Sequence, residues 1–270
     1  MTTELKPYEV YAIRYAENPR LAGQNFIGGD PHNGPMPHDY FVWVIVGNGR
    51  TWLVDTGFDA DMAVRRERPR LRCPSEGLAL LGISVADIKD VIITHMHYDH
   101  AGNEELFAGA TFHLQDAEMS FATSRHMCHS IMSHAYECED VVAMVRRLYR
   151  GKLQFHECTE ELAPGLSVHH IGGHTQGLQA VRVWTRRGWV VLASDAAHFY
   201  ANMVESRPFP IVHNVANMME GFRTLRRLAS SPEHIIPGHD PLVMKKYPAP
   251  RADLEGIVVR LDVEPRPSFA

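Results

Sequence analysis

Cysteine is scarce in this chain. Only four occur among 270 residues, at positions 73, 128, 138 and 158, and no two of them form a CxxC pair. This spacing indicates neither a disulfide framework nor a thiolate zinc site. We expect free thiols that are buried or half-exposed.

Long apolar runs and an excess of positive charge are also missing. No stretch supplies the roughly 18 apolar residues of a membrane helix, and Met1–Pro7 does not lead into the apolar run of a secretory signal. The formal net charge of −5 gives no overall attraction to nucleic acid or to an anionic membrane. We therefore expect a cytoplasmic protein that binds neither nucleic acid nor a membrane.

What is present is the pattern of a layered α/β protein. Short runs rich in Val, Ile, Trp and Phe predict strands at 41–46, 51–54, 91–94, 111–114, 166–171, 180–184, 189–193 and 234–236. Periodic apolar residues and end signals predict helices at 75–81, 116–123, 135–149 and 214–229. The Pro-rich segment 247–267 is interpreted as an extended tail, packed on the domain or leaving it. The order of elements favours an α/β sandwich, and we place residues 1–270 in a single domain.

One segment carries four candidate metal ligands within six positions. The apolar run Val91–Thr94 is followed at once by His95, His97, Asp99 and His100. A buried strand ends at the edge of its sheet, where side chains can converge on one point. Imidazole and carboxylate without thiolate suit zinc, and also iron, manganese or cobalt. A single histidine here would be an ordinary loop residue, but four ligand types at this spacing predict a metal site.

Three more candidates follow predicted strands. His174 is preceded by two glycines, Asp195 by a serine, and His239 by Pro-Gly. Each one alone is as compatible with a loop position as with a ligand. Their repeated placement just after a strand favours a common site.

The ligand pattern resembles that of the binuclear metallo-β-lactamase superfamily. The resemblance extends from Val54-Asp55-Thr56-Gly57 to Gly238-His239-Asp240 and covers most of the chain. It implies a four-layered αβ/βα sandwich with two zinc ions, or other divalent metals, at one edge of the paired sheets. It also implies the ligand assignment: one metal held by His95, His97 and His174, the other by Asp99, His100 and His239, with Asp195 as the bridge. Asp55 would either orient a ligand imidazole or only cap a turn.

Within the superfamily the chain is most similar to the N-acyl homoserine lactonases and other small-lactone hydrolases. Its length, the helical insert between His100 and His174, and the short interval from Asp195 to His239 carry this resemblance. It implies an enzyme that opens a small lactone, either an acyl homoserine lactone, as in quorum quenching, or a lactone of aromatic catabolism. The nucleophile would be a hydroxide that bridges two metals, and Asp99 would pass its proton to the leaving group.

Two positions depart from the lactonase pattern. Lactonases commonly have Tyr three residues after the bridging Asp, where this chain has His198. The His198 imidazole could donate the same bond to a substrate carbonyl, Tyr200 could approach instead, or His198 could only pack beside the metals. Gln176 stands where the family more often has Pro. A thioesterase, a cyclic-amide hydrolase and a non-catalytic metal-binding protein stay open as alternatives, and so does a homodimer.

Three further features are interpreted as structural. The insert 126–138, rich in His, Met and Cys, has no ordered ligand spacing and is expected to line a core or an apolar pocket. The basic run from Arg65 to Arg72 could attract a carboxylated substrate or a phosphate, but solvated surface is the preferred interpretation. In the family that the chain resembles, a loop in the position of 31–38 borders the pocket. His32 and His38 are therefore candidates for substrate contact, but ordinary loop positions are the preferred interpretation.

Overall fold

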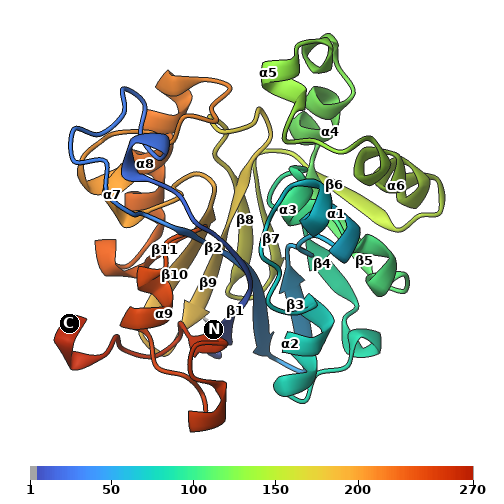
Figure 1. Cartoon of the computed structure of the whole chain (residues 1–270). Helices are drawn as coiled ribbons and strands as arrows, with labels where there is room; N and C mark the ends of the chain where they lie inside the picture. Colours follow the sequence, from blue (N-terminus) through green and yellow to red (C-terminus); the bar gives the residue numbers. More distant parts are fainter. Residues whose placement is uncertain (1–4, 270) are drawn as a thin grey trace.

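Two mixed β-sheets packed face to face form the centre of the protein in a computed structural model that describes residues 5–269 (Figure 1). The larger sheet has the order β12-β1-β2-β3-β4-β5-β6. Its strands are β1 (Glu9–Asn18), β2 (His38–Gly47), β3 (Arg50–Val54), β4 (Asp90–Ile92), β5 (Thr111–Gln115), β6 (Leu153–His156) and β12 (Val258–Arg260). The smaller sheet has the order β11-β10-β9-β8-β7. Its strands are β7 (Thr159–Ala163), β8 (Leu166–His170), β9 (Gln179–Thr185), β10 (Gly188–Ser194) and β11 (Ile235–Pro237).

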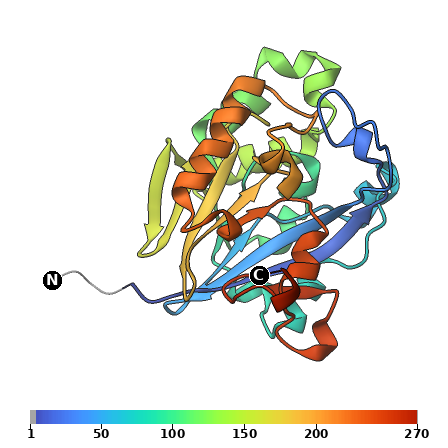
Figure 2. The same ribbon diagram turned by 90° about the vertical axis from the view of Figure 1, so that its left-hand side faces the viewer.

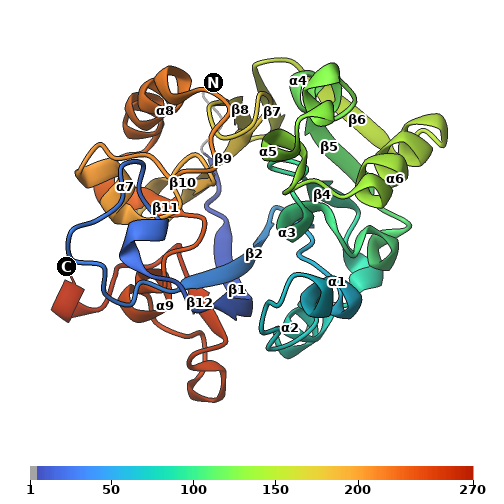
Figure 3. The same ribbon diagram turned by 45° about the horizontal axis from the view of Figure 1, so that its top comes forward.

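Helices cover the outer face of each sheet (Figures 1 and 3). Beside the larger sheet lie α1 (Ala60–Arg65), α2 (Pro74–Leu80), α3 (Tyr98–Ala101), α4 (Asp116–Ala122), α5 (Ser130–Ser133) and α6 (Cys138–Tyr149). Beside the smaller sheet lie α7 (Tyr200–Val204) and α8 (Val215–Leu228), and Figure 2 shows α8 crossing its outer face. The short helix α9 (Leu242–Lys246) packs near β12.

The alternation of side chains along each strand divides the core into layers. On β2, Trp43 faces the space between the sheets and Val44 faces the helices beside the larger sheet. On β10, Leu192 faces the other sheet and Val191 packs with residues of α8. Because both faces of these strands are buried, they appear in the sequence as nearly continuous apolar runs.

The observed architecture confirms the predicted αβ/βα sandwich. Each predicted strand and helix has a counterpart whose ends differ by up to three residues. The sequence did not indicate β1, β6, β7, β12 or the shortest helices. Of the two interpretations of the Pro-rich segment, the structure supports packing, since β12 pairs antiparallel with β1 through Tyr11 and Arg260. Within residues 5–269, no helix combines the length and the hydrophobicity that crossing a membrane requires.

Candidate metal centre

The segment after β4 brings four ligand-type side chains to one end of the sheets. β4 is a parallel neighbour of both β3 and β5, and its three residues are buried. His95 and His97 lie in the loop that follows, and Asp99 and His100 lie on the one-turn helix α3. All four side chains are buried. The chain turns directly at the strand end, so the four residues stay within one small region.

The other three predicted ligands follow strands of the smaller sheet that run in the same direction. β10 and β11 are parallel, and β8 and β10 are both antiparallel to β9. His174, Asp195 and His239 follow β8, β10 and β11, and all three are buried. Gly238 leaves room for this arrangement, because a Cβ at that position would lie 2.7 Å from Asp195 Oδ1. The structure thus brings all seven predicted ligands to the edge shared by the two sheets.

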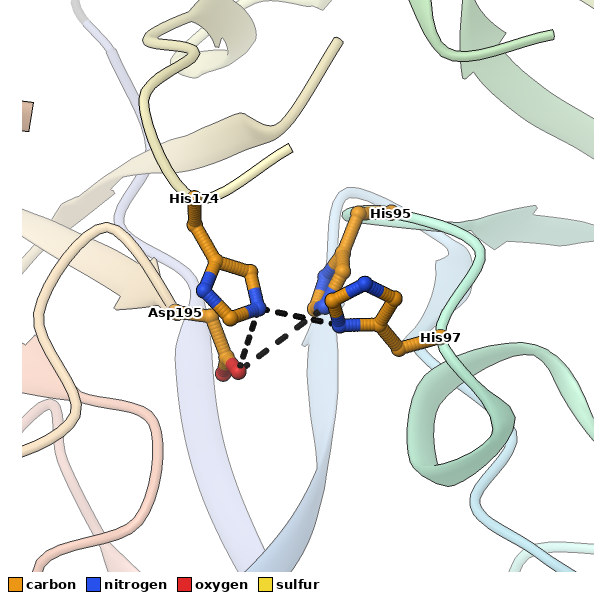
Figure 4. A group of neighbouring side chains, drawn as sticks. All are labelled: His95, His97, His174 and Asp195. Atoms are coloured by element: carbon orange, nitrogen blue, oxygen red, sulfur yellow. Dashed lines mark hydrogen bonds and ion pairs between the residues drawn. The ribbon is translucent and has the colours of Figure 1, made fainter. Parts of the chain in front are cut away.

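Four side chains make up the first ligand group, which Figure 4 shows pointing toward a common centre. They are His95, His97, His174 and Asp195, and their ligand atoms all lie within 4.8 Å of one another. His174 Nε2 lies 3.0 Å from His97 Nδ1 and 3.2 Å from Asp195 Oδ2. His95 Nε2 lies 3.8 Å from the same oxygen. A tetrahedral zinc site with bonds near 2 Å has ligand atoms about 3.3 Å apart, so this group has suitable dimensions.

The second ligand group consists of Asp99, His100 and His239. Asp195 adjoins both groups, because its Oδ2 faces the first group and its Oδ1 faces the second. Asp195 Oδ1 lies 3.0 Å from His239 Nε2 and 3.3 Å from His100 Nε2. Asp99 Oδ2 lies 3.4 Å from His100 Nε2. The two oxygens of Asp195 therefore face different groups, as in a carboxylate that bridges two metals.

Hydrogen bonds outside the centre fix the orientation of two ligand imidazoles. His174 Nδ1 donates to the Ile211 carbonyl at 2.7 Å, and His239 Nδ1 donates to the Asp39 carbonyl at 2.9 Å. A carbonyl oxygen can only accept, so the proton of each neutral ring is on Nδ1. The Nε2 lone pair of each ring is thereby directed into the centre.

Asp55 performs the same task for His100. Its Oδ2 lies 2.7 Å from His100 Nδ1, and the carboxylate also accepts bonds from the backbone and the hydroxyl of Thr94 at 2.7 and 2.8 Å. Asp55 is fully buried and has a positive φ of 61°. Of the two interpretations that the sequence left open, this contact matches the carboxylate that orients a ligand imidazole.

Several buried atoms in the centre have no hydrogen-bond partner among the described residues. In the two ligand groups these atoms are His95 Nε2, His100 Nε2 and Asp195 Oδ1. An unpaired buried polar atom costs about 1–3 kcal/mol, so an arrangement of three is stable only with a group that accepts their lone pairs. Nitrogen and oxygen donors without sulfur suit zinc and also iron, manganese or cobalt. Two divalent metal ions fit these residues.

The electrostatic environment of His95 in the first group differs from that of His100 in the second. Burial, and then the neighbouring imidazoles, hold the pKa of His95 well below its usual range. Burial opposes protonation of His100 as well, but the carboxylates of Asp99, Asp195 and Asp55 raise its pKa well above the usual value. This excess of negative charge around His100 is what a metal cation would balance.

The two predicted substrate-contact residues have different positions. His198 is buried at the centre, with Nε2 at 2.9 Å from Asp195 Oδ2 and its ring stacked on Phe209 at 3.7 Å. Burial, only partly offset by Asp195, lowers the pKa of His198 to about 3, so the ring is neutral. Tyr200 is on α7, outside both ligand groups, with Lys246 Nζ at 4.5 Å from its ring centroid. It lines a different cavity, so we do not retain Tyr200 as a substrate contact.

Several residues of the centre's surroundings were not recognised in the sequence. His38 is not a loop residue but begins β2, is buried, and stacks on His239 with ring centroids 5.1 Å apart. His32 is an exposed loop residue, as preferred. Arg66 and Arg68 are not merely solvated surface, because both line the cavity over the metal centre. No sequence pattern marks these positions, since the contacts depend on how separate loops meet.

Glu118 on α4 links the two loops that carry the three histidines of the first ligand group. Its fully buried carboxylate accepts hydrogen bonds from Met96 N at 2.9 Å and Gly177 N at 3.0 Å. It also accepts from the hydroxyls of Tyr136 at 2.8 Å and Thr175 at 2.6 Å. Nothing in the sequence indicates this role beyond a Glu near the start of a predicted helix.

A sandwich of this kind, with nitrogen and oxygen side chains in two groups at the edge of its sheets, is the architecture of a metal-dependent hydrolase. Residues 36–239 match the family described as the metallo-beta-lactamase superfamily, and the chain belongs to that superfamily. The chain is 30% identical to the N-acyl homoserine lactonase AiiB of Agrobacterium fabrum over 171 residues, which are 61% of each chain. It is 28% identical to an N-acyl homoserine lactonase of a Bacillus species over 134 residues, 49% of this chain and 48% of the relative.

Solved structures show the same fold. A quorum-quenching N-acyl homoserine lactone lactonase superimposes with a TM-score of 0.73 at 21% identity, covering 90% of this chain and 95% of that one. AidC, a dizinc quorum-quenching lactonase, superimposes with a TM-score of 0.66 at 15% identity, covering 88% of this chain and 90% of that one. At these identities the likeness concerns the fold.

Proposed function

We propose that this protein is a binuclear-metal hydrolase that opens a small lactone. The observation that carries the proposal is the position of Asp195, whose two oxygens face two separate ligand groups. Two divalent metals, when bound there, supply a hydroxide at neutral pH and polarise a carbonyl oxygen. The sequence similarity to N-acyl homoserine lactonases supports a lactone as the substrate.

Asp99 is the proposed proton carrier. Its side chain lines the cavity and is 11% exposed, whereas that of Asp195 is 4% exposed. Burial opposes its ionisation, but His100 and His239 hold the pKa of Asp99 below its usual range. Asp99 is therefore ionised at neutral pH, and it can accept a proton from the attacking water and deliver it to the departing alkoxide.

His198 is the proposed donor to the substrate carbonyl. Its Nε2–H points at Asp195 Oδ2, which is also a ligand atom of the first group. Once that oxygen serves as a ligand, the Nε2–H is left for a substrate oxygen. His198→Phe should lower kcat about 100-fold, the usual cost of losing one oxyanion donor, and His198→Tyr should restore most of it. Equal losses in both variants would mean that His198 only packs beside the metals.

A ring-opening assay on metal-loaded protein tests the function itself. The protein would be loaded with zinc, manganese or cobalt and offered lactones, thioesters and cyclic amides, with proton release as the readout. Opening of at least one lactone, lost in His97→Ala, is the expected result. Cleavage of thioesters or cyclic amides without any lactone opening would contradict the proposal. Bound metal without any turnover would indicate a non-catalytic protein.

A further inference from the structure

Three arginines line the cavity over the metal centre, and they differ in how their charge is balanced. They are Arg20, Arg66 and Arg68. Arg66 forms an ion pair with Glu137, and its guanidinium lies 4.5 Å from the centroid of the Tyr98 ring. Among the described residues, no carboxylate forms an ion pair with Arg20 or Arg68. Two guanidinium groups at the cavity are therefore without a counter-charge.

Arg20 is held in place by hydrogen bonds that leave one side of its guanidinium open. Nε donates to Asn25 Oδ1 at 2.9 Å and Nη2 donates to the Gln24 carbonyl at 2.7 Å. The guanidinium carbon lies 5.2 Å from the centroid of Phe209, a ring that also lines the cavity. Nη1 has no hydrogen-bond partner among the described residues. An immobilised guanidinium loses little entropy when it binds an anion.

Arg68 approaches the same space from the loop after α1. It adjoins the hydroxyls of Tyr40 and Tyr98, which are 3.5 Å apart, and its buried Nε has no partner in the described structure. Burial lowers the pKa of Arg20, and the charge of Arg68 lowers it further, against an opposing effect of Tyr40. Both guanidinium groups line the same cavity, so their like charges repel each other, and an anion between them would relieve that repulsion.

Packed side chains connect each arginine to the ligand groups, Arg20 through Phe209 and His198 and Arg68 through Tyr40. On one side, Phe209 contacts Arg20 and stacks on His198. On the other side, Tyr40 adjoins Arg68 and packs edge-on against His239 at 5.1 Å. Asp99 and Asp195, which also line the cavity, belong to the ligand groups and cannot neutralise the guanidinium groups. A substrate with its carbonyl at the centre would place its next substituent beside the arginines.

On the basis of the proposed function, we infer that Arg20 and Arg68 bind a carboxylate group of the substrate. The substrate is then a compact lactone that bears this carboxylate near its scissile ester. The planar fork of a guanidinium matches a carboxylate in geometry and charge. Arg20 and Arg68 line the same cavity as the ligands Asp99 and His239, so a carboxylate bound by the arginines lies close to the ester at the metal centre. A neutral acyl homoserine lactone would leave both positive charges without a partner.

A matched pair of substrates tests this inference. A γ-butyrolactone with a ring carboxylate and its methyl ester would be compared in the zinc-loaded wild type, R20M, R68M and the control R65M. Arg65 is on α1, is paired with Glu137, and does not line the cavity. We expect the carboxylate form to be preferred in the wild type and in R65M. In R20M and R68M the ratio of the two kcat/KM values should fall about 10- to 100-fold, mainly through KM.

Equal kcat/KM for acid and ester in the wild type would overturn the inference, and so would an unchanged ratio in R20M and R68M. R20K and R68K keep the charge and should keep part of the preference. If a methionine variant does not fold, which thermal unfolding would reveal, the corresponding lysine variant replaces it in the comparison.

Binding without turnover separates this inference from the proposed function. Calorimetry on the zinc-loaded protein would compare glutarate with butyrate, which has one carboxylate fewer. Glutarate should bind about 10-fold more tightly in the wild type, and R68M should remove the difference. If no lactone is opened but this difference is found, the function is wrong and the anion site stands. If lactones are opened but the difference is missing, the anion site is wrong and the function stands.

Discussion

Two clusters of buried histidines within residues 5–269 can be compared, the metal centre and a pair formed by His113 and His156. In the metal centre, His95 Nε2 and His100 Nε2 have no hydrogen-bond partner among the described residues. In the second cluster, His113 on β5 and His156 on β6 stack with centroids 5.2 Å apart, and His113 Nδ1 lies 2.9 Å from His156 Nε2. Their outer nitrogens reach Asp90 Oδ1 at 3.2 Å and Glu160 Oε2 at 2.7 Å. Every ring nitrogen of this pair is satisfied.

The difference follows from where the histidines lie on their strands. His113 lies within β5 and His156 is the last residue of the adjacent parallel strand β6, so the ladder of the sheet holds the two rings side by side. The ligands of the metal centre lie beyond strand ends, where loops let side chains from both sheets converge. The two clusters are nevertheless similar in residue type and in burial. Open lone pairs directed at a common point distinguish a ligand set from a closed network.

Loss of a ligand should produce the largest effect. His97→Ala removes one of four donors of the first group, so metal occupancy and activity should both fall more than about 100-fold, beyond the loss expected when only an orienting residue is removed. Metal analysis after dialysis and a ring-opening assay would measure this. His113→Ala is the matched control, and this variant should retain the metal bound at the metal centre. Metal loss in both variants would remove the distinction between the clusters.

A smaller effect is expected from the carboxylate behind a ligand. Asp55→Asn weakens the bond that orients His100, so the affinity for the second metal should fall about 10- to 100-fold. Titration with zinc buffers would give the affinity. Asp90→Asn changes the corresponding carboxylate of the second cluster and should leave zinc affinity unaltered. An unaltered affinity in Asp55→Asn would assign Asp55 to turn capping instead.

Much of the fold and the ligand pattern could be predicted from the sequence because local rules determine them. Strands such as β2 and β10 are buried on both faces, so their apolar runs are conspicuous. Strand β7 could not be recognised, because it is a largely exposed edge strand with the polar sequence Thr159–Ala163. β12 is only three residues long and lies in a Pro-rich segment, and its pairing with β1 depends on tertiary structure.

The surroundings of the metal centre could not be predicted for a related reason. The ligands follow strands, and strand ends can be recognised locally. Arg20, His38 and Arg68 come from separate segments whose meeting depends on the packing of the whole larger sheet. A basic run is normally solvated, and nothing in the residues from Arg65 to Arg72 shows which members turn inward.

A substitution at Glu118 tests how much a closed hydrogen-bond network next to the metal centre contributes to the stability of the fold. Its carboxylate accepts four hydrogen bonds, and Glu118→Gln would set an amide NH₂ against some of these donors. We expect a loss of about 3 kcal/mol in the free energy of unfolding. Urea denaturation of the metal-free protein would measure it. Glu160→Gln, at the half-exposed end of the second cluster, should cost less, and an equal cost would show that burial of the carboxylate is not decisive.

The smallest effects are expected in the second cluster, and they should depend on which partners remain. His156→Leu leaves His113 Nδ1 buried without a partner, so unfolding should become easier by about 1–3 kcal/mol while metal content stays unchanged. Adding His113→Leu removes that unpaired nitrogen, and Asp90 still forms an ion pair with Arg50, whose Nη2 lies 3.1 Å away. The double variant should therefore lose less free energy of unfolding than the sum of the two single variants. Urea denaturation of both single variants and the double variant measures this coupling, with the exposed His129→Leu as control. Additive costs would mean that the two histidines stabilise the sheet independently. Loss of metal in His156→Leu would mean that the second cluster supports the first through the strands between them.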